Sequence, residues 1–152
     1  MAQTKVFHTD LKSTVAFRAY QNGASGATAS IVANVPTKIN FTTANYNIGN
    51  FYNPSLSRAI APAKGLYFFH AYAQLLAASP HDVGAYFYIN GIQQNRTYNG
   101  LYQYPELMGT EVFLLNAGDY VEFYGLDRSA TTSMENNSQT NAFMGYLIGL
   151  VD

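Results

Sequence analysis

Three histidines are the only side chains whose ordinary pKa suits acid–base chemistry near neutral pH: His8, His70 and His81. The chain has no cysteine, which excludes thiolate nucleophiles, disulfides and cysteine-ligated metals. The run Ser79-Pro80-His81-Asp82 in an expected loop contains the residue types of a nucleophilic triad, but neighbours in sequence do not adopt triad geometry by adjacency. His8 falls in the N-terminal segment, and His70 alternates with Phe68 and Tyr72 on an expected strand. The histidines therefore predict no active site, and the protein is expected not to be an enzyme.

The carboxylates are not grouped for acid–base work or for a metal. We expect Glu111 and Glu122 to face solvent from strands, and Asp82, Asp127 and Glu135 to lie at strand ends or in loops. Calcium needs several oxygen ligands from at least two segments, and no spacing of an EF-hand type is present. Solvated loop acids explain these residues, so the sequence predicts no metal and no cofactor.

One segment combines aromatic and polar side chains in a way that suits recognition. It runs from Asn90 to Tyr104 as NGIQQNRTYNGLYQY, and we expect it to be a long loop. Rigid tyrosines beside amide and arginine donors are typical of surfaces that bind proteins or sugars. The candidate ligand-binding residues are Arg96, Tyr98, Asn99, Tyr102 and Tyr104. An ordinary loop in a chain rich in Asn and Tyr explains the pattern equally well.

The elements that would position these residues are strands. Helical spacing of apolar residues is missing, and short runs of Tyr, Phe, Val, Ile and Thr alternate with Gly, Asn, Pro and Asp. Asn90-Gly91 predicts a tight turn, because both residues tolerate positive φ, and 116–119 predicts another. The expected strands are 14–20, 30–33, 37–42, 58–61, 65–76, 84–89, 111–115, 120–126 and 141–151. About nine to ten short strands in one domain predict an all-β sandwich or jelly roll.

Several expected strands are apolar on both faces, although a strand with one wet face should alternate. One face fills the core, and the other needs a second apolar neighbour. Hydrophobic residues make up 48% of the chain and charged residues only 11%, which favours a surface hidden against other copies. The candidate interface residues are Leu66, Phe68, His70, Tyr72, Tyr146 and Ile148. The alternative is that the tyrosines lie flat on the surface with their hydroxyls in water.

The segment 41–72 resembles the signature of the C1q globular-head family, a branch of the tumour-necrosis-factor-like jelly rolls. The matching positions are Phe41, Asn47, Tyr52, Gly65, Tyr67 and Phe69. Weaker similarities to the family occur in the expected order at 15–20, 116–121 and 143–148. Ala59 and Ala71 stand where the family has aromatic residues. The resemblance implies a jelly-roll β-sandwich that forms a homotrimer and works by surface recognition. It gives Tyr67 and Phe69 a role in the core.

The expected organisation is an N-terminal arm, 1–13, followed by one domain, 14–152. No basic run suits nucleic acid, no apolar run is long enough to enter a membrane, and no signal peptide is visible. The absence of cysteine and of a collagen-like stalk favours a microbial or bacteriophage protein. We expect a trimeric structural or adhesion module of a virion: a capsid decoration, head-fibre or tail-fibre tip, attached to a capsid or tail protein through residues 1–13. The alternative is a bacterial lectin-like or protein-binding module at a cell surface, with a surface glycan or protein receptor.

Overall fold

The computed structural model describes residues 15–21, 29–77, 79–103 and 105–151, and every regular element in these ranges is a strand. The strands are β1 (Ala16–Tyr20), β2 (Ala29–Ile31), β3 (Thr37–Lys38), β4 (Thr43–Ile48), β5 (Tyr52–Asn53), β6 (Arg58–Ile60), β7 (Gly65–Leu76), β8 (His81–Ile89), β9 (Ile92–Tyr102), β10 (Glu106–Leu115), β11 (Tyr120–Asp127), β12 (Thr132–Met134) and β13 (Asn141–Leu150). The expected N-terminal arm lies outside the described residues.

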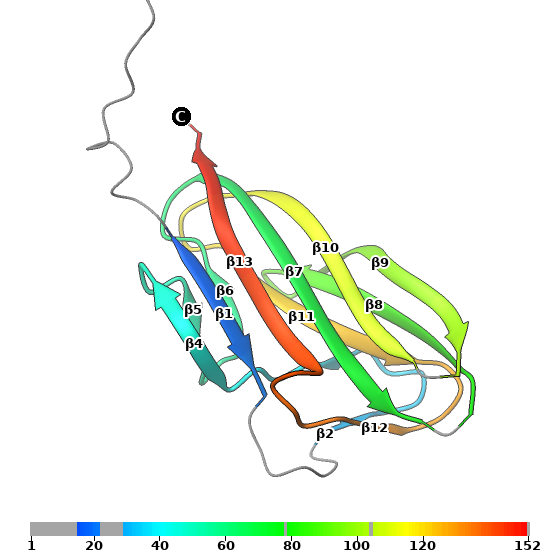
Figure 1. Cartoon of the computed structure of the whole chain (residues 1–152). Helices are drawn as coiled ribbons and strands as arrows, with labels where there is room; N and C mark the ends of the chain where they lie inside the picture. The colour runs from blue at the N-terminus through cyan, green and yellow to red at the C-terminus, as the bar shows by residue number, and fades with distance from the viewer. Residues whose placement is uncertain (1–14, 22–28, 78, 104, 152) are drawn as a thin grey trace, which may run out of the picture.

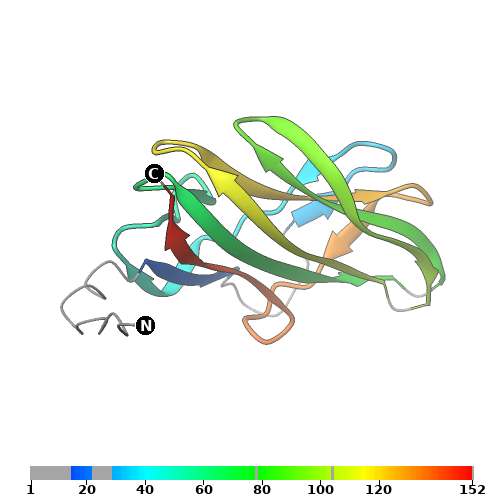
Figure 2. The same ribbon diagram turned by 90° about the horizontal axis from the view of Figure 1, so that it is seen from above.

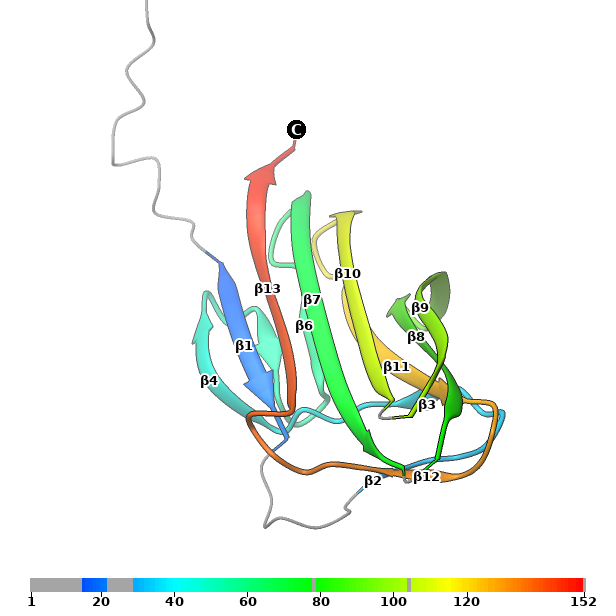
Figure 3. The ribbon, with the colours of Figure 1, turned by 45° about the vertical axis from the view of Figure 1, so that its right-hand side comes forward.

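The strands form two facing sheets (Figures 1 and 2). The first sheet has the order β2-β12-β7-β13-β1-β4, with β10 also paired to β7. The second has the order β5-β6-β11-β8-β9, with β3 paired to β11. In Figure 3 the strands β1, β13, β7 and β10 lie side by side in front of β6 and β11. The predicted jelly-roll sandwich is confirmed.

Aromatic rings fill the space between the sheets. Tyr67 and Phe69 of β7 are fully buried, as the family resemblance implies, and Phe69 contacts the rings of Phe143 and Phe87 at 6.0 and 6.3 Å between centroids. Phe17 of β1 stacks on Tyr52 at 4.5 Å. Other large, fully buried side chains are Phe41, Phe51, Phe123, Ile31, Ile39, Leu107 and Leu115.

The alternation of buried and exposed residues is regular along β7 and β10. The alternation places one face of each strand in this core and directs the other face away from it, onto the outer surface of the sheet.

Two turns follow the prediction closely. Asn90 and Gly91 join β8 to β9 with φ of 52° and 78°, values that suit a type I′ hairpin turn. Gly118, between β10 and β11, has φ of 88°, and the Asp119 N–H donates to the Asn116 carbonyl at 3.1 Å. These turns set the register of the hairpins they close.

The strand prediction was wrong in several places: β5 and β12 were not expected, and β10 begins at Glu106 instead of 111. Residues 92–102 are a strand, β9, which pairs with β8 from Ile92 to Tyr102, so the segment expected as a long loop is an edge strand. The expected strand 37–42 is shorter, and a separate strand, β4, follows it and pairs with β1. His81 begins β8 rather than lying in a loop.

Candidate functional site

The outer surface of the first sheet carries an apolar face. The register aligns Ile48, Ala16, Tyr146, Phe68 and Val112 in one row across β4, β1, β13, β7 and β10. The rings of Phe68 and Tyr146 stack at 5.0 Å within this row. Adjacent rows bring further large side chains to the same surface, because outward residues alternate with core residues along each strand.

We define the apolar face as the ten residues Tyr46, Ile48, Leu66, Phe68, Tyr72, Met108, Val112, Leu114, Met144 and Tyr146. Seven of them are 38% to 59% exposed, and Phe68, Tyr72 and Met144 are half-buried. By contrast, the second sheet contributes only two of the large, exposed hydrophobic residues in the described ranges, Ile92 and Leu101 on its edge strand β9. The apolar surface is therefore concentrated on one of the two layers.

The predicted interface residues Leu66, Phe68, Tyr72 and Tyr146 all belong to this face, and His70 lies among them on β7. Ile148 is exposed beside the face, where the pairing of β13 with β7 shifts register after Leu147. The structure therefore brings five of the six predicted residues onto one surface and places the sixth at its margin. Their contact with another copy stays a prediction.

His70 is the polar centre of the apolar face. Its Nδ1 lies 2.7 Å from the Thr110 hydroxyl, and its ring centroid is 5.8 Å from that of Tyr72. Burial lowers the pKa of His70, and a hydrogen bond that the ring donates to the backbone of Gly109 offsets this only in part. Met144 of β13 lies opposite His70, and Arg18 of β1 lies opposite Met144 in the same row. Arg18 forms a hydrogen bond with Asn45. A neutral His70 is therefore favoured on this face.

Four of the five predicted ligand-binding residues, Arg96, Tyr98, Asn99 and Tyr102, lie on β9 instead of a loop. The register places Arg96 opposite Tyr86, Asn99 opposite Gly84, and Tyr98 and Tyr102 opposite Ala85 and His81. The side chains of Arg96, Tyr98, Asn99 and Tyr102, and Tyr104 as a whole, lie outside the described residues. Their role in binding stays a prediction.

A buried polar cluster around Asp127 was missed from the sequence. Asp127 is inaccessible to solvent at the end of β11, and its Oδ2 lies 2.6 Å from His81 Nδ1 and 2.7 Å from the Thr132 hydroxyl. A carboxylate oxygen only accepts, so His81 donates through Nδ1–H. Burial raises the pKa of Asp127, but the hydrogen bonds from His81, Thr132 and the backbone of Ser129 and Ala130 together outweigh it and lower that pKa.

This cluster ties three strands together, because His81 begins β8, Asp127 ends β11 and Thr132 begins β12. The arrangement is structural, since all the acceptor positions of the carboxylate are used. No local signal in the sequence joins these residues, since His81 and Asp127 are 46 residues apart.

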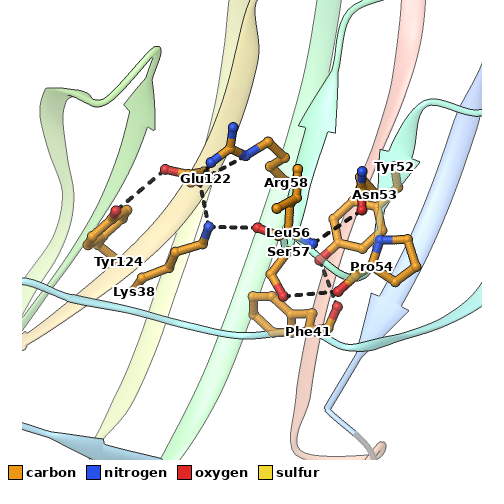
Figure 4. A network of polar contacts seen from close by, with 10 residues as sticks. All are labelled: Lys38, Phe41, Tyr52, Asn53, Pro54, Leu56, Ser57, Arg58, Glu122 and Tyr124. Atoms are coloured by element: carbon orange, nitrogen blue, oxygen red, sulfur yellow. Dashed lines mark hydrogen bonds and ion pairs between the residues drawn. The ribbon is translucent and has the colours of Figure 1, made fainter.

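Glu122 was expected to face solvent, and the structure shows that this was wrong. It is only 3% exposed on the outer side of the second sheet, where Lys38 and Arg58 cover it (Figure 4). Its Oε1 lies 2.5 Å from Lys38 Nζ and 2.9 Å from Arg58 Nη2, and Tyr124 donates to Oε2 at 3.4 Å. Two cations for one carboxylate compensate the cost of burying the charge.

Within the described part of the chain, no three His, Asp or Glu side chains are grouped closely enough to hold a metal ion. The same ranges contain no helix with the length and apolarity needed to cross a bilayer.

Two antiparallel layers in this strand order define the jelly-roll class to which C1q and tumour-necrosis-factor domains belong. The chain is a member of the C1q family: the model of the C1q domain matches residues 16–148. Domains of this kind are typically trimeric and non-enzymatic.

Solved structures agree on the fold. The chain is similar to the globular domain of zebrafish complement 1qA protein, with a TM-score of 0.63, 13% identity and coverage of 90% of this chain and 99% of that one. It is similar to murine APRIL, with a TM-score of 0.62, 9% identity and coverage of 90% and 100%. It is also similar to Eiger TNF from S. frugiperda, with a TM-score of 0.61, 8% identity and coverage of 91% of this chain and 95% of that one. A comparison with curated protein sequences gives no match.

Proposed function

We propose that the protein is a non-enzymatic structural or adhesion module that assembles as a homotrimer through the apolar face, and that it serves on a bacteriophage virion. The observation that carries the proposal is the concentration of large, exposed hydrophobic residues on the first sheet. Membership of the C1q family supports three copies as the form of assembly, because such domains are typically trimers.

Covering the apolar face would contribute favourable energy to an interface. Fully burying a large side chain is worth roughly 1.5–3 kcal/mol. Seven members of the face keep 38% to 59% of their surface exposed, so covering each adds about 1 kcal/mol. A contact that covers most of the face therefore contributes several kcal/mol per subunit, before the cost of association.

The virion part of the proposal is supported by composition and architecture. The domain has no cysteine, so its sandwich is stabilised by an aromatic core without disulfides. Only 11% of residues are charged, which suits a chain that works inside an assembly. A capsid or tail protein would hold it through residues 1–13.

Two valine variants test the assembly. Val112, on the apolar face, and Val35, in the turn between β2 and β3, are both 49% exposed. We expect Val112→Asp to convert the trimer to monomer in sedimentation equilibrium, and Val35→Asp to leave it intact. Equal behaviour of the two variants would overturn the use of this face.

The virion role is tested on particles. Mass spectrometry of purified virions from a host culture should find the protein in a fixed ratio to the capsid or tail protein. A protein recovered only from the soluble fraction, and never with particles, would exclude the role while leaving the trimer untouched.

A further inference from the structure

The outer surface of the second sheet differs in kind from the apolar face. Its strands β3, β6, β8 and β11 present tyrosines and charged residues, and the exposed aliphatic side chains of this sheet, Ile92 and Leu101, lie on its edge strand β9. The register sets Lys38, Tyr124 and Tyr86 in one row and Glu122 opposite Tyr88 in the next. This surface belongs to the opposite layer from the apolar face (Figure 3). Other copies that cover the apolar face would therefore leave it accessible to solvent.

Lys38 and Arg58 share one carboxylate and leave one positive charge in excess. Both hold Glu122 Oε1, and the ammonium group also donates to the Leu56 carbonyl at 2.6 Å (Figure 4). Another ion pair, Arg128 with Asp82 at 2.9 Å, is neutral as a unit. The chain as a whole has a net charge of -1, so the excess charge at this site is opposite in sign to that of the whole chain.

Both cations keep unused donors. An ammonium has three N–H groups and a guanidinium five. Lys38 uses two of its three, and Arg58 uses Nε and one Nη2 N–H, so Nη1 has no partner among the described residues. The two side chains are 24% and 26% exposed. The buried Glu122 fixes both heads at the surface, which lowers the entropy that a ligand must pay to order them.

Aromatic rings flank these donors. Arg58 lies over the ring of Tyr120 at 4.0 Å from the centroid, and Tyr88 stacks on Tyr124 at 3.9 Å. The Tyr88 hydroxyl donates to Gln93 at 2.9 Å. Flat rings and hydroxyls suit the C–H faces and hydroxyls of a sugar, while a guanidinium edge suits a carboxylate through two parallel hydrogen bonds.

We propose that this surface binds acidic saccharides, with a sugar carboxylate held by Arg58 and Lys38 and the rings lying beside Tyr88 and Tyr124. Charge complementarity selects the acidic class, because the excess charge is positive and the remaining groups on the two heads are all donors. The proposal does not depend on assembly through the apolar face.

Calorimetric titration with an oligogalacturonate tests the proposal on the full chain. The fully methyl-esterified oligomer is the matched neutral ligand, and inorganic phosphate is the matched small anion. We expect the acidic oligomer to bind and the ester and phosphate to bind at least about tenfold more weakly. Failure of the acidic oligomer to bind, or equal binding of phosphate, would overturn the proposal.

Variants locate the binding. Arg58→Gln should weaken oligogalacturonate binding about tenfold or more, and Lys64→Gln, which also removes one positive charge but from the connection between β6 and β7, should not. Equal loss in both variants would show unspecific attraction and overturn the site. Should Arg58→Gln fail to fold, amide shift mapping on the wild-type chain decides: shifts confined to β3, β6, β8 and β11 support the site, and shifts elsewhere contradict it.

Discussion

Replacing Asp127 by Ala should destabilise the domain more than any other single carboxylate change in the described chain. The side chain is fully buried and accepts hydrogen bonds from His81 and Thr132 at 2.6 and 2.7 Å and from the backbone of Ser129 and Ala130 at 2.9 and 3.3 Å. The two backbone donors lie on an exposed turn, where water replaces the carboxylate. His81 and Thr132 are buried, and stranding each costs about 1–3 kcal/mol.

We therefore expect Asp127→Ala to lower the free energy of unfolding by about 2–6 kcal/mol, measured by urea denaturation at a fixed protein concentration. Asp82→Ala is the matched control, because Asp82 is 44% exposed in its ion pair with Arg128 and should cost less than about 1 kcal/mol. A loss for Asp127→Ala within experimental error of the control would refute the reasoning.

The wild type and Asp127→Ala also give a pH test. Folding lowers the pKa of Asp127, so its contribution is present above the unfolded pKa of about 4 and is lost as pH falls through the folded value. The difference in stability between wild type and Asp127→Ala should therefore be full at neutral pH and shrink in acid below about pH 4. A difference that grows on acidification would contradict this sign.

Three further predictions concern packing, a turn and the apolar face. Gly145→Ala should lower the free energy of unfolding in urea by about 1–3 kcal/mol, because a Cβ there would meet the Phe69 ring at 2.7 Å. Gly149→Ala is the control and should lower it far less, because the space around Gly149 is open. Equal losses in the two variants would contradict the packing. Asn90→Ala should lose about 1–2 kcal/mol, since it removes two side-chain hydrogen bonds and places Ala at φ of 52°, and an unchanged melting temperature would contradict it. Covering the apolar face would bury His70 further and disfavour its charged form, so assembly should weaken as pH falls through the pKa of His70, which burial within the chain already lowers from its ordinary 6.5. His70→Gln should remove this dependence in sedimentation, and a persisting dependence would place it elsewhere.

The fold could be predicted from the sequence largely because its signals are local. Alternating core aromatics such as Tyr67 and Phe69, and the positive-φ pair Asn90-Gly91, mark strands and turns without knowledge of their partners. The apolar face followed from the same reasoning, since two-sided apolar strands have only one core to fill.

What could not be predicted depends on partners far apart in the chain. Residues 92–102 read as a loop because their polar and aromatic residues do not alternate, and pairing with β8 makes them a strand despite two register shifts. Glu122 has the sequence of an exposed strand residue and is buried only because Lys38, 84 residues away, lies across it. Asp127 and His81 are 46 residues apart, so no local pattern reveals their bond.

The most direct test of assembly through the apolar face is native mass spectrometry of the wild-type chain beside Val112→Asp. We expect a single species of three chains of 16.7 kDa for the wild type and a single chain for the variant. A wild-type monomer at micromolar concentration, or a trimer that survives Val112→Asp, would contradict it.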